Sequence, residues 1–450
     1  MLFNSIEFFI FLPIVFILYW KVVGAQLRLQ NVFVVVASYV FYGWWDWRFL
    51  LLIALTTGCS YVSGRLIENY GGRRSMQRVV CISNIVLNLA ILCYFKYVNF
   101  FGESFAALLR TIGMQADWVT IDVLLPVGIS FYTFQALSYT IDVYRNKMKP
   151  THDVVAFFAF VSFFPQLVAG PIERATNLLP QFEQKRMFDY DKAVDGMRQI
   201  LWGLFKKIVV ADNCAAVVNS VWAAYDDQSG ATLLLAAIFF TFQIYGDFSG
   251  YSDIAIGTAR LFGINLKRNF NFPYFSRDIA EFWRRWHISL NTWFRDYIYI
   301  PLGGSRCSRW KVMRNTMIIF LVSGFWHGAN WTFICWGAFH ALLFFPLMLL
   351  GKNRKHTDNV AEGRLLPSLK EAGQMLLTFV LALIGWIIFR AENIGQAMDY
   401  IARMISPTLL NLSSLHGEKY LIFVVILIIS EWLQRDKQHA LQTSSGGVTY

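Results

Sequence analysis

The segment NTMIIFLVSGFWHGANWTFICWGAFHALLFFPLMLLG occupies residues 315–351 and contains no Lys, Arg, Asp or Glu. It is longer than the roughly 20 apolar residues that cross the hydrocarbon core of a bilayer as a helix. Inside lipid every backbone polar group needs a partner, so such a segment forms helix and not open sheet. The segment therefore predicts a membrane protein, and it carries an ionisable side chain, His327, within its apolar stretch.

The composition of the whole chain agrees with this prediction. Its 450 residues are 56% hydrophobic and only 15% charged, whereas a soluble domain carries about 25% charged residues. A chain with so few charges cannot cover a water-facing surface, which excludes a soluble globular enzyme. The net charge of +11 is typical of cationic cytoplasmic loops beside anionic lipid, so we expect membrane lipid as a partner and no nucleic acid.

Long apolar runs between charged residues mark the expected membrane spans. They predict an all-α, polytopic membrane protein with about eleven transmembrane helices, which forms a single domain over residues 1–450. The first run follows no basic region and no cleavage motif, so we expect a retained helix and not a signal peptide. The expected spans cover residues 5–20, 31–45, 48–67, 79–102, 119–141, 154–170, 197–223, 231–263, 315–350, 370–389 and 419–433.

The stretch 264–314 differs from these runs because it holds ten basic residues against three acidic ones, interleaved with aromatic residues. It is too polar to face lipid and too aromatic for a free loop, which predicts short interfacial or re-entrant helices and a functional site. Arg284, Arg285 and Arg295 are candidate ligands for a phosphorylated donor, since guanidinium groups match phosphate oxygens. The same arginines also fit a purely topological role on the cytoplasmic side.

His327 is the first candidate for chemistry, because a buried ionisable side chain in a membrane segment is costly. The helical spacing predicts that His327 and Asn330 share one face, where the amide would orient the imidazole. A neutral imidazole is the form that accepts a proton. The residues alone also allow a hydrogen-bonded core histidine without a catalytic role.

Two further histidines and two aspartates complete the candidates. His287 lies among aromatic residues and arginines, where it fits either a site or a membrane anchor. A zinc site formed by His287, His327 and His340 lacks closely spaced ligands and a nearby thiol or carboxylate, so we predict no metal. Asp247 and Asp253 lie in an apolar run and are expected to pair with the arginines and set the fold.

Five long segments occur in a characteristic order. They are LLPVGISFYTFQALSYTIDVYR (124–145), LVAGPIER (167–174), YGDFSGYSDIAIG (245–257), NFNFPYFSRDIAEFWRRWHISLNTWFRDYIYIPLGG (269–304) and SGFWHGANWTFICWGAFHA (323–341). Together they resemble the membrane-bound O-acyltransferase superfamily, and within it the bacterial alginate O-acetylase branch. The motif-bearing core covers about 120–345. Relatives usually continue past EWLQRDKQHALQ (431–442) into another apolar helix, where this sequence has TSSGGVTY, so the sequence leaves the C-terminal topology open.

The resemblance implies a fold and roles for individual residues. It implies about eleven helices around a central funnel with a thinned centre. The family's catalytic histidine follows a tryptophan and precedes a glycine, which maps to Trp326, His327 and Gly328. A second histidine of the family maps to His287. The predicted site then consists of catalytic His327 and His287, supporting Trp326, Asn330 and Asn291, and donor-binding Arg284, Arg285 and Arg295.

The resemblance also implies a reaction. An acyl group, in the first place acetyl, moves from a cytoplasmic thioester such as acetyl-CoA to a hydroxyl of an exported polysaccharide or peptidoglycan. The transfer is direct or runs through an extracytoplasmic partner of the SGNH acetyltransferase or esterase type. His327 serves as the base, no cofactor stays bound, and the protein lies in the bacterial cytoplasmic (inner) membrane.

Two alternatives remain open at this point. A sister group of the family transfers D-alanine to teichoic acid from a carrier-protein thioester, and an acidic carrier would dock on the basic face. A different class is a transporter or scaffold subunit of a polysaccharide export complex, in which His327 relays protons or packs. The inverted hydropathy repeats common in transporters are not evident in the sequence.

Overall fold

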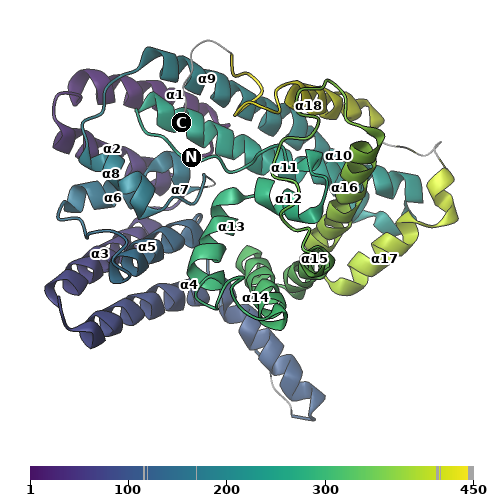
Figure 1. The fold of residues 1–450 in the computed structure, drawn as a ribbon, viewed down its shortest axis with the longest axis horizontal. Coiled ribbons are helices and arrows are strands. Elements are labelled where there is room, and N and C mark those ends of the chain that lie inside the picture. The colour runs from purple at the N-terminus through teal and green to yellow at the C-terminus, as the bar shows by residue number, and fades with distance from the viewer. Residues whose placement is uncertain (115–116, 119, 169, 412–414, 416, 444–450) are drawn as a thin grey trace. The chain divides into compact units, whose positions relative to one another are not determined.

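The computed structural model describes residues 1–450 except 115–116, 119, 169, 412–414, 416 and 444–450. The described residues form helices and contain no strand, which confirms the predicted all-α class. The chain divides into two compact units, Met1–Ala193 with Thr258–Leu266 and Val194–Gly257 with Lys267–Tyr450 (Figure 1). The single membrane domain of the sequence analysis stays a prediction.

The first unit is a helical bundle in which polar side chains join neighbouring helices. The amide of Asn84 on α4 donates to the hydroxyl of Thr140 on α5 over 2.8 Å. The amide of Asn31 on α2 donates to the carbonyl of Phe182 on α8 over 2.7 Å. Its helices are α1 (Ile6–Ile17) with the π-helical turn η1 (Leu18–Val22), α2 (Leu27–Gly43), α3 (Arg48–Asn69), α4 (Arg74–Thr111), α5 (Ile129–Tyr144), α6 (Val154–Ser162), α7 (Phe164–Leu167) and α8 (Ala175–Glu183).

The second unit holds most of the quoted motifs. Its helices are α9 (Tyr190–Leu204), the π-helical η2 (Phe205–Ala211), α10 (Asp212–Ala223), η3 (Tyr225–Asp227), α11 (Gly230–Leu261), η4 (Pro273–Phe275), α12 (Ile279–Arg285), α13 (Ile288–Phe294), the π-helical η5 (Arg295–Tyr299), α14 (Arg309–His327), α15 (Trp331–Leu349), α16 (Leu369–Arg390), α17 (Ile394–Met404), η6 (Pro407–Leu410), η8 (Glu418–Tyr420) and α18 (Leu421–Leu433). Helices α9 and α11 run from one unit into the other. The stretch 264–314 is broken into short helices, as predicted.

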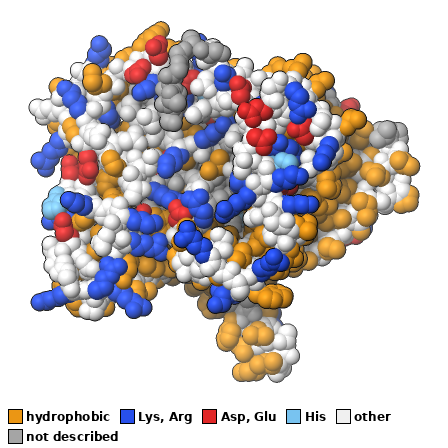
Figure 2. Space-filling model, viewed as in Figure 1, with side chains coloured by type: hydrophobic (Ala, Val, Ile, Leu, Met, Phe, Trp, Pro, Cys, Tyr) orange, Lys and Arg blue, Asp and Glu red, His pale blue; other side chains and the backbone are white. Residues whose placement is uncertain are grey.

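Five of the described helices, α3, α4, α11, α15 and α16, are long and apolar enough to cross a membrane. Several such helices agree with a polytopic membrane protein, while the number of eleven spans stays a prediction. Figure 2 shows hydrophobic side chains along the edges of the view and many Lys and Arg side chains on the face turned to the viewer. Hydrophobic side chains on the surface are expected where a protein meets lipid.

The prediction of one span over 315–350 is wrong, because this run forms two antiparallel helices, α14 and α15. The chain leaves α14 at Gly328, whose backbone is extended at φ −166° and ψ 158°. Asn330 then begins α15 by accepting a hydrogen bond from the amide of Thr332 over 3.0 Å. A side chain at Gly324 or Gly337 would overlap the facing backbone, so these glycines allow the two helices to pack closely.

Two other expected spans also differ from the structure. In the run 119–141, of which residue 119 lies outside the described residues, helix begins only at Ile129, after Gly128 with a positive φ of 74°. The run 154–170, of which residue 169 also lies outside the described residues, is divided at Phe163 into α6 and α7. The amide of Phe164 there donates to the hydroxyl of Ser38 over 3.1 Å instead of continuing the helix.

Candidate active site

His327 is the last residue of α14 and is half-buried. Its imidazole packs against three aromatic side chains, with ring centroids 5.0 Å from Trp326, 5.2 Å from Trp336 and 5.4 Å from Phe389. These rings surround it with apolar surface, yet leave part of the residue accessible. A proton acceptor needs this combination, because a substrate must reach it while bulk water is kept away.

His287 lies between the short helices α12 and α13 and is only 1% exposed. Its φ of +46° is unusual for a residue other than glycine. Burial, followed by the charge of His327, holds the pKa of His287 well below its usual value. The indole of Trp326 contacts both imidazoles, at 5.9 Å from His287 and 5.0 Å from His327. The structure thus brings the two predicted histidines and Trp326 together.

His340 is also fully buried, but it lies deeper in the aromatic packing. Its Nδ1 accepts a hydrogen bond from the indole of Trp283 over 3.3 Å, and its ring lies 5.1 Å from Trp336. In the part of the chain that the structure describes, no group of three or more His, Cys, Asp or Glu side chains gathers to hold a metal. His340 therefore has the surroundings of a packed core residue.

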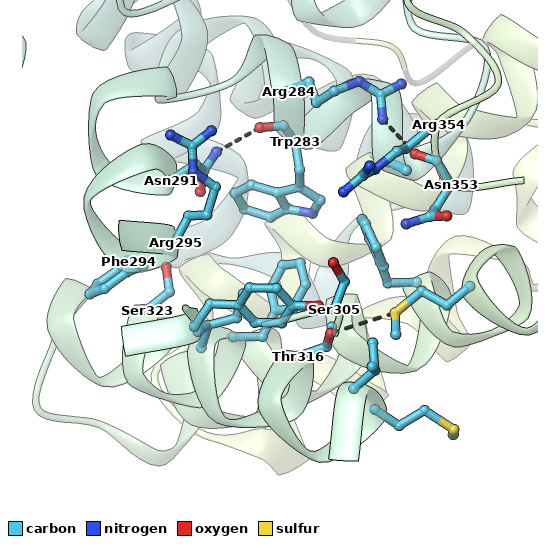
Figure 3. A pocket seen from close by; sticks show the side chains of 18 of the residues that line it. Trp283, Arg284, Asn291, Phe294, Arg295, Ser305, Thr316, Ser323, Asn353 and Arg354 are labelled. Carbon is cyan, nitrogen blue, oxygen red and sulfur yellow. Dashed lines mark hydrogen bonds between the residues drawn. The ribbon is translucent and has the colours of Figure 1, made fainter. Parts of the chain in front are cut away.

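A cavity of about 690 Å³ lies in the second unit, and we call it the arginine cavity. Four arginines line it, Arg284, Arg295, Arg309 and Arg354, and its described lining residues include no Asp or Glu. Figure 3 shows Arg284, Arg295 and Arg354 around the indole of Trp283. Its other lining residues are Ala280, Asn291, Phe294, Tyr299, Ser305, Cys307, Val312, Met313, Thr316, Ile319, Phe320, Ser323, Phe344, Met348, Leu349 and Asn353.

The arginine cavity reaches toward His327 along α14. Ser323 lines it, and it lies four residues before His327, which places both on one side of the helix. Trp283 lines it as well, and Trp336 lies between Trp283 and His327 with ring centroids 5.5 Å and 5.2 Å away. The cavity lining thus includes a residue one helical turn before His327.

The structure separates the three predicted donor-binding arginines. Arg284 and Arg295 line the arginine cavity, and Arg284 donates to the carbonyls of Asn353 and His356 over 2.7 and 2.6 Å. Arg285 does not line the cavity but forms a buried ion pair with Glu281, with the nearest atoms 2.9 Å apart. Its guanidinium thus contacts Glu281, and Arg285 is not among the residues that line the cavity.

The two predicted supporting asparagines take different positions. Asn291 lines the arginine cavity, and its amide donates to the carbonyls of Trp283 and Trp286 over 2.6 Å each, which holds α12 against α13. The sequence analysis expected Asn330 and His327 to share one face of a helix. The structure contradicts this, because α14 ends between the two residues. The amide of Asn330 donates to the carbonyl of Glu392 over 2.8 Å, so it fixes the hairpin after His327.

A second hollow, of about 450 Å³, lies between α11 and α16, and we call it the aromatic groove. Its wall residue Phe248 packs on His287 with ring centroids 4.6 Å apart. Phe389, also in its wall, packs on His327 at 5.4 Å. The groove is lined by Phe240, Gln243, Ile244, Asp247, Phe248, Tyr251, Phe389 and Arg390. Each histidine therefore contacts one aromatic side chain that lines the groove.

Asp247 and Asp253 on α11 pair with lysines of η2. Lys207 lies 2.6 Å from Asp247, and Lys206 lies 2.5 Å from Asp253. The π-helical turn η2 places both lysines toward α11, and sequence periodicity does not reveal such a local distortion of a helix. Asp253 also interacts electrostatically with Arg268 of the basic stretch 264–314. Arg284, Arg285 and Arg295 contact other groups.

Sequence reasoning did not identify several residues of the site. Asn269, which contacts His287, begins a quoted motif and follows a basic pair, but nothing in the local pattern marks its amide. Arg354 lies outside the stretch 264–314 and joins the arginine cavity only through the fold. Phe248 and Phe389 look like ordinary apolar residues of two helices, and only their packing reveals contact with the histidines.

The fold and these motifs define a class of protein, the membrane-bound O-acyltransferases. The model of this family, described as membrane-bound O-acyltransferase, matches residues 148–370. The chain is 43% identical over 417 residues to the probable alginate O-acetylase AlgI of Pseudomonas aeruginosa. This alignment covers 92% of this chain and 77% of that protein. The chain is 32% identical over 447 residues to the peptidoglycan O-acetyltransferase of Helicobacter pylori (93% and 82%). It is 29% identical over 282 residues to the teichoic acid D-alanyltransferase of Streptococcus thermophilus (58% and 68%).

These similarities establish the family. The chain belongs to the membrane-bound O-acyltransferase family, which confirms the predicted resemblance. It is an acyltransferase of a membrane-bound kind, and several of its helices are apolar enough to span a membrane.

Proposed function

We propose that this protein moves an acetyl group from a cytoplasmic thioester to a hydroxyl of an exported polysaccharide or peptidoglycan, with His327 as the base. The observation that carries the proposal is the position of His327. His327 lies one helical turn after Ser323, which lines the arginine cavity, and its half-buried imidazole packs on Phe389, which lines the aromatic groove. We propose that a side chain near both hollows meets a donor from one and an acceptor from the other.

The charge distribution along α14 and α15 supports the assignment of the arginine cavity to the cytoplasmic side. Lys and Arg concentrate in short cytoplasmic loops of membrane proteins. The opposite end, with His327, lies about 27 Å further along α14 at 1.5 Å per residue. The basic residues at the start of α14 and after α15 are Arg306, Arg309, Lys311, Arg314, Lys352, Arg354 and Lys355.

The chemistry of the arginine cavity supports a phosphorylated thioester as the donor, in the first place acetyl-CoA. Arg284, Arg295 and Arg354 offer guanidinium groups that match phosphate oxygens. The inner wall, with Trp283 and Phe320, is apolar and suits the uncharged thioester end of such a donor. Charge at the mouth and apolar surface inside would orient the acyl group toward His327.

In the proposed mechanism, His327 takes the proton of the acceptor hydroxyl as its oxygen attacks the thioester carbonyl carbon. The tetrahedral intermediate then collapses, the bond from carbon to sulfur breaks, and the departing sulfur receives the proton from His327. The products are an ester and a thiol, and the histidine returns to its neutral form. The reaction needs neither an oxidant nor a covalent enzyme intermediate.

The acceptor is proposed to approach from the side of the aromatic groove, opposite the basic end of α14. Its hydroxyl belongs to the polymer or to an SGNH-type acetyltransferase or esterase partner outside the cytoplasm. The relatives named as alginate O-acetylase and peptidoglycan O-acetyltransferase support an exported polymer as the final acceptor. Transfer from a cytoplasmic donor to such a polymer requires the bacterial inner membrane as the location.

A second candidate is transfer of D-alanine from a carrier-protein thioester to teichoic acid. The similarity to a teichoic acid D-alanyltransferase favours it, and the arginines around the cavity would also attract an acidic carrier. A role as transporter or scaffold predicts no ester formation at all. The three candidates therefore differ in the modification that appears on the polymer.

Mass analysis of surface polymers tests this proposal. Polymers are isolated from bacteria with the gene deleted, with the gene restored, and with the His327→Ala gene restored. Ester-linked acetyl groups that appear only with the unchanged gene would support the proposal. Ester-linked D-alanine would favour the second candidate. Polymers that stay unmodified with the unchanged gene would contradict the proposed transfer, and full modification with His327→Ala would contradict the assignment of His327 as the base.

A further inference from the structure

The orientation of one buried amide determines the protonation of His287. Asn269 is fully buried, and its Oδ1 accepts hydrogen bonds from the backbone amide of Ser289 at 3.3 Å and from its hydroxyl at 2.8 Å. The backbone amide of Ser289 is always a donor, so the atom facing it must be the oxygen of Asn269 and not its nitrogen. The amide nitrogen of Asn269 then faces the hydroxyl of Ser252 at 3.2 Å.

The same oxygen lies 3.1 Å from Nδ1 of His287. Because Asn269 Oδ1 can only accept, Nδ1 of His287 must carry a hydrogen. Burial keeps the imidazole of His287 neutral, so a neutral ring with a hydrogen on Nδ1 has a free lone pair on Nε2. This Nε2 is buried and has no hydrogen-bond partner among the residues that the structure describes.

We propose that Asn269 is a positioning residue, which fixes His287 with its hydrogen on Nδ1 and leaves Nε2 as a hydrogen-bond acceptor beside His327. This inference rests on the proposed function, because it assigns His287 a part in the same reaction. The unpaired acceptor is filled when a donor enters, namely the attacking hydroxyl or the imidazolium that His327 forms. The unusual backbone of His287, which turns the chain between α12 and α13, holds the ring in this place.

The surroundings of His287 contain few charges that could change its state. Phe248 from α11, Phe270 and Trp326 from α14 pack on the ring, and His327 is the titratable group that acts on it. The neighbouring charged residues are Asp247, paired with Lys207, Asp253, paired with Lys206, and Arg268, which precedes Asn269.

The Asn269→Asp variant tests the inference through the pH dependence of transfer. The variant's carboxylate still accepts from Nδ1, but its charge stabilises the imidazolium and raises the pKa of His287. Below that raised pKa, Nε2 carries a hydrogen and can no longer accept one. Transfer of labelled acetyl from acetyl-CoA is measured in membranes that contain the whole chain. As the pH is lowered, we expect transfer by the variant to begin to fall at a higher pH than transfer by the unchanged protein. At still higher pH the activity of the variant should recover.

The Ser289→Ala variant is the matched control, because it removes a bond to the same oxygen and leaves the pair of Asn269 and His287. For Ser289→Ala, the pH at which transfer falls on the acidic side should match that of the unchanged protein. If transfer by Asn269→Asp fell at the same pH as transfer by the unchanged protein, the positioning role would be overturned. The amounts of both variants in the membrane are compared in the same preparations.

A double-mutant cycle decides the question if Asn269→Asp does not accumulate. We expect Asn269→Ala alone to lower kcat about 10- to 100-fold, and to lower it less than about twofold in a His287→Asn background. An equal loss in both backgrounds would show that Asn269 does not act through His287. Failure of the unchanged protein to transfer acetyl would overturn the proposed function itself, whereas normal transfer with an equal loss overturns only the positioning role.

Discussion

The two histidines of the site lie close to the same tryptophan but in different surroundings. His327 is half-buried at the end of a long helix, where it packs on Phe389 of the aromatic groove. His287 is 1% exposed, and its Nδ1 is hydrogen-bonded to a buried amide. This difference fits the proposed roles, in which the accessible imidazole of His327 exchanges protons with substrate and the rigid imidazole of His287 supplies a fixed acceptor.

The same contrast appears between the two arginines next to each other on α12. Arg284 lies in the wall of the arginine cavity and donates to the backbone carbonyls of Asn353 and His356. Arg285 turns inward to Glu281, a carboxylate that is 1% exposed. Adjacent residues of the same type thus face a cavity and a buried carboxylate, because successive side chains on a helix point about 100° apart. We propose ligand binding for Arg284 and a role in folding for Arg285.

The largest effect is expected from His327→Ala. Removal of a general base lowers rates by about 10²- to 10⁴-fold, so transfer of acetyl to polymer should fall by that factor. The amount of protein in the membrane should stay unchanged, because the residue is half-buried at a helix end. Transfer is measured with labelled acetyl-CoA, and His152→Ala, an exposed histidine in the first unit, serves as the control. Equal losses of transfer for both variants would contradict the assignment of His327 as the base.

His287→Ala should have a smaller effect on transfer. Loss of a hydrogen bond that involves a charged group costs about 1.5–3 kcal/mol, which corresponds to roughly 10- to 100-fold in rate. We expect kcat to fall and the KM for acetyl-CoA to change little, since His287 does not line the arginine cavity. If His287→Ala proved as damaging as His327→Ala in kcat, the distinction between the two histidines would fail.

The adjacent arginines should separate binding from folding. Arg284→Ala should raise the KM for acetyl-CoA about tenfold, the loss expected for one charge-assisted bond to phosphate, with normal abundance. Arg285→Ala leaves the buried Glu281 with fewer partners, which costs about 1–3 kcal/mol of stability, so abundance and thermal stability should fall. Both are measured on detergent-purified protein. A normal KM for Arg284→Ala would remove the arginine cavity as the donor site.

The smallest effect is expected at the aromatic groove. Arg390→Gln keeps a polar side chain but removes a charge from the groove lining, and we expect the KM for the polymer or partner acceptor to rise about two- to fivefold at a screened, partly exposed position. The KM for acetyl-CoA should stay unchanged. A change in the donor KM alone would assign the groove to the donor and reverse the two sides of the site.

The sequence predicted the helical membrane class and the two histidines because these depend on local signals. An apolar run without charges specifies a membrane helix, and the motifs around His287 and His327 identify the family. The sequence does not mark the break of the run 315–350, because the run holds no charged residue and glycine is frequent in membrane helices. Its cause lies in packing, since a side chain at Gly328 would overlap the ring of Phe333.

The composition of the two hollows could not be predicted from local patterns. Arg309 and Arg354 join Arg284 only because α14 and α15 form a hairpin, which brings distant parts of the chain together. The separation of Arg284 from Arg285 depends on which of them reaches the buried Glu281. The proposed positioning role of Asn269 depends on its three hydrogen bonds to His287 and Ser289, which only the folded structure reveals.

Transfer across sealed membrane vesicles tests most directly whether His327 connects two sides of the membrane. Labelled acetyl-CoA is supplied either to vesicles with the cytoplasmic face outward or to vesicles of the opposite orientation, each with the unchanged protein or with His327→Ala. We predict that labelled ester appears on polymer inside the first kind of vesicle, only with the unchanged protein. Label that enters equally from either face, or that still appears with His327→Ala, would contradict the account.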